Sequence, residues 1–315
     1  MIDLELVEKI WSDSKINPRF LKELNKVCAP AGKSAPPGVH TLSALPTFFC
    51  TLFEGNIPAL VPIVSAWNVL RLTARLLDDL EDQNSRNDGS FPLSINLSTG
   101  LLFTAAAILD KLEAYAVDAT TAAAIRLRFK EAGLKTCSGQ HIDLLQIDIS
   151  LDECWEMVEA KSGAALALIC WAGARLGTQE EKHLNLAYQF GLHLGILDQI
   201  ADDLKDLWSS NTAQTDLKQT CPGTLPIVYT KSVLPPDECD LFVKNLALAK
   251  TDPAYEEIVR QAVIESGAAL YLAVQSTLVY NRALALIEQL NVAGSSADVK
   301  VLIALLNQIH FVRTT

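Results

Sequence analysis

Residues 69–82 read VLRLTARLLDDLED, a largely apolar stretch that ends in four acidic side chains. Asp78 and Asp82 are four residues apart, so a helix places both carboxylates on one face, one turn apart. A helix that is solvated on most sides carries more polar residues than this one. The stretch therefore predicts a packed helix with an acidic end, over residues 58–83.

A second stretch has the same form, since residues 190–206 read FGLHLGILDQIADDLKD. Asp202 and Asp206 are again four residues apart. Like charges at this spacing cost a helix about 0.2–0.5 kcal/mol, and carboxylates are unfavourable at the C-terminal end of the helix dipole. A bound divalent cation would remove both penalties, and Mg²⁺ is usually shared between carboxylates and substrate phosphates. The simpler interpretation is a solvated helix end, but two such clusters on apolar helices favour the metal.

Helical periodicity covers almost the whole chain, and no apolar–polar alternation bounded by turn signals predicts a strand. Loops are expected at 30–37, 82–92 and 209–226, where proline, glycine and small polar residues gather. The sequence predicts an all-α fold in one domain, residues 1–315. We expect helices over 2–13, 17–28, 41–54, 58–83, 95–115, 119–147, 152–176, 180–208, 237–250, 254–289 and 296–312.

The charge of the chain and its cysteines indicate which partners and which cellular compartment to expect. The formal net charge is −11, with 37 acidic and 26 basic residues, which disfavours nucleic acid and anionic membranes as partners. The seven cysteines form no CxxC pair and the N-terminus does not resemble a signal peptide, so we expect free thiols and a cytoplasmic protein. Apolar stretches such as 57–67 are too short for a bilayer, and we expect no transmembrane segment.

Five motifs in order along residues 25–230 resemble those of the trans-isoprenyl diphosphate synthase family. Residues 78–82 match its first aspartate-rich motif, DDxxD, and residues 195–206 match its second, GxxxQxxDDxxD. Residues 139–143 (GQHID) resemble the family's GQxxD, and residues 159–164 (EAKSGA) resemble its KTG segment. The DL…TLP segment is matched at residues 216–217 and 224–226.

The resemblance implies an isoprenoid-synthase-type helical bundle around a central cavity, with the two aspartate motifs opposed at its mouth. About three Mg²⁺ ions would clamp an allylic prenyl diphosphate between the motifs. Direct metal ligands would be Asp78, Asp82 and Asp202. The remaining aspartates would bind metal through water or hold the direct ligands in place, namely Asp79, Asp203 and Asp206.

The resemblance also assigns side chains to the diphosphate. Lys161 would neutralise its oxygens as a point charge, and Gln140 and Gln199 would line the pocket. With the metal, Lys161 would stabilise charge on the leaving group while the C–O bond breaks to an allylic cation. A dry cavity would keep water from that cation. The alternatives are a solvated lysine and a glutamine without a role in binding.

The family's second site, which binds isopentenyl diphosphate, is incomplete in this sequence. Residues 31–37 (AGKSAPP) keep the lysine of the family's GGKRxRP segment but neither arginine, and Arg71 stands where the family has histidine. Arg86 alone stands where the family has two arginines, and residues 221–223 (CPG) replace the lysine before TLP. Each lost charge-assisted hydrogen bond is worth about 1.5–3 kcal/mol, so a second diphosphate would bind weakly.

We therefore expect terpene-synthase-like cyclisation or quenching of the cation. The alternative is a prenyltransferase, which either elongates the chain or uses another acceptor, as the pheromone-modifying family members do. Thr73, Ala74 and Trp67 lie five, four and eleven residues before the first aspartate. These positions predict a pocket about 16 Å deep, enough for roughly three to four isoprene units, farnesyl to geranylgeranyl size. Family members are commonly homodimers, and we expect the same here.

Two other classes are less compatible with the sequence. A di-iron carboxylate bundle needs two ExxH helices, whereas Glu180 to His183 is the only copy and lies in a polar stretch. A helical scaffold without catalysis would show no Mg²⁺-dependent release of diphosphate.

Overall fold

The chain folds into helices alone in the part that the computed structural model describes. That part comprises residues 2–31, 42–82, 91–145, 147–208, 223–249, 251–293 and 296–310, and it contains no strand. The expected all-α fold class is confirmed.

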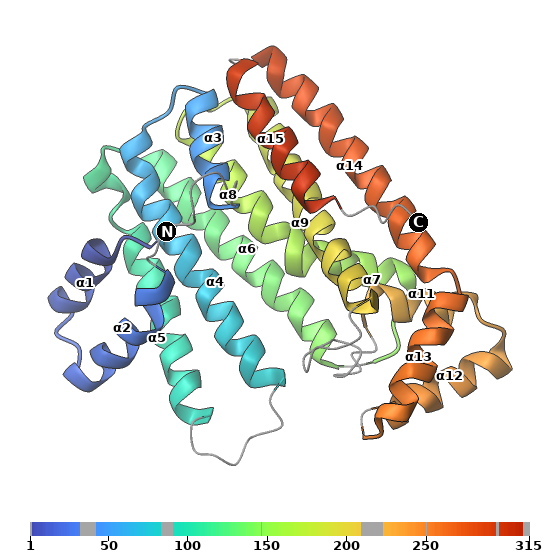
Figure 1. Cartoon of the computed structure of the whole chain (residues 1–315). Coiled ribbons are helices and arrows are strands. Elements are labelled where there is room, and N and C mark those ends of the chain that lie inside the picture. The colour runs from blue at the N-terminus through green and yellow to red at the C-terminus, as the bar shows by residue number, and fades with distance from the viewer. Residues whose placement is uncertain are drawn as a thin grey trace. The chain divides into compact units, whose positions relative to one another are not determined.

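Most elements are regular α-helices, with three short 3₁₀ segments and one π-helical segment (Figure 1). The α-helices are α1 (Leu4–Asp13), α2 (Pro18–Ala31), α3 (Leu45–Leu52), α4 (Leu60–Asp82), α5 (Phe91–Leu109), α6 (Ala119–Leu145), α7 (Leu151–Val158), α8 (Ala164–Arg175), α9 (Glu181–Trp208), α11 (Leu225–Val233), α12 (Pro236–Ala249), α13 (Pro253–Glu265), α14 (Ala268–Ala293) and α15 (Ser296–Ile309). The 3₁₀ segments are η1 (Leu42–Ala44), η2 (Ile57–Ala59) and η3 (Leu112–Tyr115), and η4 (Glu159–Gly163) is the π-helix.

The helices form two compact units. The first comprises residues 1–131 and 168–187, and the second comprises residues 132–167 and 188–315. The single domain over residues 1–315 stays a prediction.

In the first unit, α4 and α5 pack side by side and α1 joins them (Figure 1). The indole N–H of Trp11 on α1 donates a buried hydrogen bond of 2.9 Å to the hydroxyl of Thr104 on α5. The backbone N–H of Asp3 donates to the hydroxyl of Ser65 on α4, also at 2.9 Å. These bonds satisfy polar groups that burial would otherwise penalise, and they fix α1 against the helix that carries the first acidic end.

In the second unit, one apolar cluster joins α7, the C-terminal part of α9 and helices α11 to α14. Helix α9 contributes Ile200 and Leu204 to this cluster, next to the second acidic end, and both are almost fully buried. Burying a side chain of this size contributes about 1.5–3 kcal/mol. The apolar face of α9 therefore anchors the turn that presents Asp202.

Three of the helices expected from the sequence differ from those in the structure. The expected helix 254–289 is two helices, because α13 ends at Glu265 and Gly267 adopts a left-handed backbone with φ +81°. The expected helix 95–115 ends at Leu109 and gives way to η3, and the expected helix 152–176 contains η4. Helix α11 was not predicted, because its nine residues directly follow a loop signal.

The expectation of free thiols is confirmed for the described cysteines. Cys28, Cys50, Cys154 and Cys170 are buried and Cys137 is exposed, and all are free. Burial raises the pKa of the Cys28 and Cys50 thiols to about 11, so these thiols stay protonated and unreactive near neutral pH.

Four described helical segments are long and apolar enough to cross a membrane, judged by length and composition alone. The sequence contains only short uninterrupted apolar runs, which is why no transmembrane segment was expected. Whole helices with a few polar residues among the apolar ones nevertheless reach the required length and hydropathy. The segments are Ile57–Glu81, Phe91–Leu109, Leu151–Arg175 and Ala268–Leu290.

Candidate active site

The acidic end of α4 exposes the carboxylates of Asp78 and Asp79. Asp78 shares one helix face with three earlier residues, because each step from Trp67 to Arg71, Ala74 and Asp78 is three or four residues. The guanidinium carbon of Arg71 lies 4.7 Å from the centre of the Trp67 ring, a cation–π contact. The position where the family's histidine was expected thus holds an arginine that is stacked on a tryptophan.

The three positions expected to set pocket depth differ in exposure. Thr73 is 1% exposed, and its hydroxyl donates a hydrogen bond of 2.8 Å to the carbonyl of Val69. Trp67 is 2% exposed, whereas Ala74 is exposed on the face of Asp78. Of the three, Ala74 is the position with open space in this unit, and the role of all three in chain length stays a prediction.

The acidic end of α9 distinguishes its two adjacent aspartates. The Asp202 carboxylate is 60% exposed and accepts a hydrogen bond of 2.8 Å from the ammonium of Lys205. Asp203 is only 4% exposed. An exposed carboxylate with one lysine contact keeps free lone pairs for a cation, whereas a buried carboxylate needs its hydrogen-bond donors within the fold.

A hydrogen-bonded chain connects Asp203 with the KTG-like segment. The amide NH₂ of Gln199 donates to an Asp203 oxygen at 2.8 Å, and the Ser162 hydroxyl donates to the Gln199 amide oxygen at 2.8 Å. An ionised carboxylate only accepts hydrogen bonds, so Asp203 orients the NH₂ group toward itself and the carbonyl toward Ser162. Asp203 therefore holds Gln199, and its expected role toward the metal stays a prediction.

Lys161 lies opposite a carboxylate of the same unit. Its ammonium donates to Asp143 at 2.7 Å, and the two side chains are 31% and 17% exposed. Asp143 belongs to the GQxxD-like motif, but sequence reasoning gave it no role. Gln140, one turn earlier on α6, is half-buried. The partial exposure of Lys161 leaves its ammonium accessible to an anion while Asp143 holds it in position.

Close backbone contacts bring these side chains together. A Cβ atom on Gly139 would lie 2.8 Å from the backbone nitrogen of Lys161, and one on Gly195 would lie 2.5 Å from the backbone oxygen of Ser162. Real Cβ contacts are longer, so only glycine allows α6 and α9 to approach η4 this closely. The π-helical η4, a form frequent at functional sites, carries both Lys161 and Ser162.

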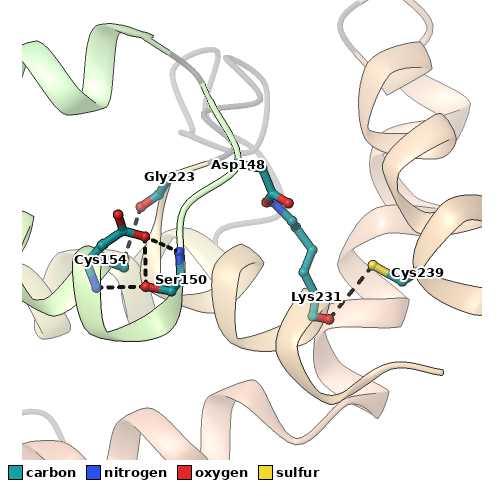
Figure 2. Close-up of polar contacts among 7 residues, drawn as sticks. Asp148, Ser150, Cys154, Gly223, Lys231 and Cys239 are labelled. Carbon is teal, nitrogen blue, oxygen red and sulfur yellow. Dashed lines mark hydrogen bonds and ion pairs between the residues drawn. The ribbon is translucent and has the colours of Figure 1, made fainter. Parts of the chain in front are cut away.

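A second set of polar contacts fixes the segment that leads into α7 (Figure 2). Ser150 and Glu153 form a reciprocal capping box at the start of α7, and Asp148 forms an ion pair with Lys231 of α11. The Cys154 thiol donates to the Gly223 carbonyl at 3.2 Å. The Ser-x-x-Glu spacing could have predicted the capping box, but no sequence signal indicated the ion pair.

Burial determines the charge state of Cys154. Burial first, and then the carboxylates of Asp203 and Asp143, raise the pKa of its thiol to about 12. The thiol therefore stays protonated and neutral near neutral pH.

Some of the predicted site residues lie outside the described residues. These are Arg86, residues 32–37 of the GGKRxRP-like segment, and residues 216–217 of the DL-like segment. Asp82 and Asp206 lie in the last turns of α4 and α9, and their side chains are not among those described. Asp78 belongs to the first unit and Asp202 to the second, so the opposition of the two motifs stays a prediction.

The donor chemistry at both helix ends fits a hard divalent cation, because exposed carboxylates such as Asp78 and Asp202 are oxygen ligands. No three acidic, histidine or cysteine side chains cluster tightly enough to hold an ion by themselves within the described ranges. Mg²⁺ seldom uses an all-protein cage and is completed by water and substrate phosphates. The site residues therefore fit a cation that arrives with a phosphate ligand.

Comparison with known proteins places this site in a family context. Tryptophan prenyltransferase ComQ of Bacillus subtilis (strain 168) is 27% identical over 245 residues, which cover 75% of this chain and 77% of that protein. A polyprenyl synthetase from Streptomyces coelicolor A3(2) has a TM-score of 0.77 at 21% identity and covers 97% of this chain and 95% of its own. Geranylgeranyl pyrophosphate synthase from Corynebacterium glutamicum, complexed with calcium and isoprenyl diphosphate, has a TM-score of 0.74 at 18% identity and covers 98% and 95%.

The structural likeness establishes the isoprenyl synthase helical fold over nearly the whole length. A family model described as polyprenyl synthetase matches residues 66–263, a span that contains both aspartate motifs, and this chain is therefore an enzyme of the polyprenyl synthetase family.

Proposed function

We propose that this enzyme ionises an allylic prenyl diphosphate of farnesyl to geranylgeranyl size and transfers the prenyl group to an acceptor other than isopentenyl diphosphate. The observation that carries the proposal is the contrast at the two diphosphate positions. Lys161 and Gln199, which we assign to the allylic diphosphate, are supported by hydrogen bonds with Asp143 and Asp203. The position of the acceptor-site histidine holds Arg71 stacked on Trp67.

Divalent ions complete the proposed site. Asp78, Asp82 and Asp202 would hold Mg²⁺, with Asp79 and Asp206 contacting it through water. When bound, the ions supply Lewis-acid stabilisation of the charge that develops on the departing diphosphate. The solved relative with calcium and isoprenyl diphosphate supports a metal and diphosphate arriving together. The number of ions, about three by resemblance to the family, is part of this proposal.

The reaction balances as a simple substitution. The bond between C1 of the prenyl chain and the bridging oxygen breaks, and its electron pair leaves with the diphosphate. Lys161 would neutralise the departing oxygens. The Gln199 amide NH₂ gives one N–H to Asp203, and its second N–H is a donor that the diphosphate could use. A nucleophilic atom of the acceptor then bonds to C1 and loses its proton to the diphosphate or to solvent.

The activity of one relative favours this acceptor class over cyclisation. ComQ is a tryptophan prenyltransferase and matches three quarters of the chain. An aromatic acceptor needs no second diphosphate site, which fits the missing arginines and histidine of that site in the sequence. Terpene-synthase-like cyclisation stays a prediction without a comparison in its favour, and chain elongation is the competing form of prenyl transfer.

The test separates the three outcomes in one assay. Purified enzyme is incubated with Mg²⁺ and geranyl, farnesyl or geranylgeranyl diphosphate, alone, with isopentenyl diphosphate, or with a tryptophan-containing peptide. Diphosphate release is measured with the product mass. Prenylated peptide that forms without isopentenyl diphosphate is the expected result. Hydrocarbons or alcohols formed without any acceptor would indicate cyclisation or quenching, and longer diphosphates formed only with isopentenyl diphosphate would indicate elongation.

We also propose a homodimer. The outer face of α5 exposes large apolar side chains, with Leu102 47% and Phe103 72% exposed. Leu93 and Ile95 of the same helix are 73% and 42% exposed, and large exposed apolar side chains gathered on one element favour a protein interface. Light scattering during size exclusion should give twice the chain mass, and Phe103→Glu should shift the protein toward the monomer.

A further inference from the structure

Helices α12 and α13 pack against each other as a hairpin in the second unit (Figure 1). An open groove of about 640 Å³ lies along this hairpin. The groove lies outside the residues assigned to catalysis. Five of the eleven residues that line it are apolar, among them buried Phe242 at its floor and, on the two helices, Leu241 and Ile258. Its rim carries the carboxylates of Glu238, Glu257 and Glu265.

The apolar walls are unusually open. Leu241 is 58% exposed and Ile258 is 47% exposed, whereas Phe242 between them is 3% exposed. Covering these two partly exposed side chains with apolar groups of a partner is favourable. An apolar groove with a polar rim is the form of surface that receives apolar side chains of a partner.

The charge around the groove is negative. Residues 236–265 contain seven acidic and three basic residues, and no described side chain that lines the groove is lysine, arginine or histidine. Arg260 has its guanidinium 3.4 Å from Glu256 and 3.7 Å from Glu257, and its side chain is only 13% exposed. Arg260 thus compensates Glu257 in part, whereas Glu238 and Glu265 have no ion pair among the described residues, and Glu265 accepts a hydrogen bond of 2.8 Å from the neutral amide of Gln261.

This combination selects one kind of occupant. Anionic lipid headgroups and nucleic acid would be repelled by the rim. A second copy of this chain, with 37 acidic and 26 basic residues, offers few cations to this rim, and its proposed contact lies on α5 instead. An amphipathic helix with apolar residues every three or four positions and lysine or arginine on its flanks would satisfy both the floor and the rim.

We propose that the α12–α13 groove is a docking surface for a cationic, amphipathic polypeptide segment of roughly the length of α12, which has 14 residues. Binding there does not require prenyl diphosphate or metal, so the proposal goes beyond the proposed function and is tested without catalysis.

The test uses a labelled peptide of leucine and lysine at amphipathic helical spacing, and the full-length enzyme without substrate. Fluorescence anisotropy measures its affinity for the wild type, for E238Q/E257Q/E265Q, and for the matched variant E5Q/E8Q/D13N on α1, whose carboxylates are exposed. The groove variant should bind at least tenfold more weakly, and the α1 variant within twofold of the wild type. Equal weakening by both variants would mean general charge attraction and would overturn the proposal.

Two further measurements locate the peptide and separate its two contacts. Leu241→Ser should weaken binding about fivefold with no change in charge, and the same peptide with glutamate in place of lysine should not bind. Carbodiimide coupling joins adjacent carboxylates and lysines, so mass spectrometry should find the peptide on Glu238, Glu257 or Glu265. Coupling spread evenly over exposed carboxylates such as Glu5, or an unchanged affinity of Leu241→Ser, would contradict a groove site. Circular dichroism confirms that each variant is folded.

Discussion

The acidic ends of α4 and α9 carry the same DDxxD pattern but give its second aspartate different surroundings. Asp79 on α4 is exposed, whereas Asp203 on α9 is buried and accepts a hydrogen bond from Gln199. A motif of this kind fixes which helix face a carboxylate shares, but the neighbours from other helices determine what the carboxylate does. The second end is also enclosed by η4 and α6, through Gly195 and the Lys161–Asp143 pair.

The first aspartate of each motif should be equivalent in function despite that difference. Asp78→Asn and Asp202→Asn each remove a carboxylate charge that would face the metal and diphosphate, and we expect kcat/KM for diphosphate release to fall about 10²–10³-fold. Melting temperatures should not change, since both side chains are exposed. Asp237→Asn on α12 is the exposed control. A loss at only one of the two positions would break the equivalence of the two ends.

Lys161 and Lys205 offer a second comparison beside α9. Each pairs with an aspartate, but Lys161 is half as exposed as Lys205. Lys161→Met should raise the KM for prenyl diphosphate about 10–100-fold, the equivalent of one charge-assisted hydrogen bond. Lys205→Met removes an exposed pair three residues apart and should change KM by less than about threefold. Steady-state kinetics over a range of prenyl diphosphate concentrations give KM for both variants. Equal changes in KM would contradict a contact between Lys161 and the diphosphate.

The buried and exposed second aspartates should differ in stability. Asp203→Leu leaves the Gln199 amide without its acceptor in a buried setting, and the free energy of unfolding should fall by about 1–3 kcal/mol. Asp79→Leu changes an exposed side chain and should stay within about 0.5 kcal/mol of the wild type. Urea denaturation at neutral pH measures both. A stable Asp203→Leu protein would show that this aspartate does not hold Gln199.

Two glycines on α6 test the packing that positions Lys161. An alanine Cβ at position 139 would lie 2.8 Å from the Lys161 nitrogen, whereas one at position 133 would meet nothing within 4 Å. Gly139→Ala should therefore cost about 1–2 kcal/mol through overpacking and should raise the KM for prenyl diphosphate. Gly133→Ala should gain about 0.5–1 kcal/mol from helix propensity with kinetics unchanged. A harmless Gly139→Ala would mean that η4 can shift without consequence for Lys161.

The periodicity of the sequence was sufficient for α4, α6 and α9 and for both acidic ends. It was insufficient wherever contacts between distant residues decide the structure. Asp143 and Lys161 are 18 residues apart on different elements, and their pairing depends on the close approach that Gly139 allows. The π-helical register of η4 leaves no sequence pattern, and the break at Gly267 appears in a helical pattern that one glycine alone does not end.

The family assignment came from spacing, because DDxxD and the residues around it survive as a linear pattern. Spacing did not predict the role of each carboxylate, because Asp202 is exposed and Asp203 is buried although they are adjacent in sequence. Ser162 gave no signal of its own, because a serine in a helix most often has no partner in another helix. It became interpretable once the structure placed its hydroxyl on Gln199.

The smallest expected effect concerns His193, two turns and more before the acidic end of α9. Burial lowers the pKa of its imidazole, the positive charge of Arg282 lowers it further, and Glu159 opposes both. The folded state therefore favours neutral His193, and the unfolded chain, with a pKa of about 6.5, takes up the proton first as pH falls. Its stabilising contribution is complete above pH about 6.5 and declines as the pH drops toward the lower folded pKa.

Urea midpoints at pH 7.5 and pH 5.5 measure this decline. The wild type should lose more stability between the two than His193→Gln, while His141→Gln, an exposed position on α6, should keep the wild-type difference. Burial also lowers the pKa of His310, so a residual slope of the same sign should remain in both variants. If His193→Gln retained the full wild-type slope, protonation of this buried imidazole would not couple to folding, and the α9 end would owe its acid sensitivity to the carboxylates alone.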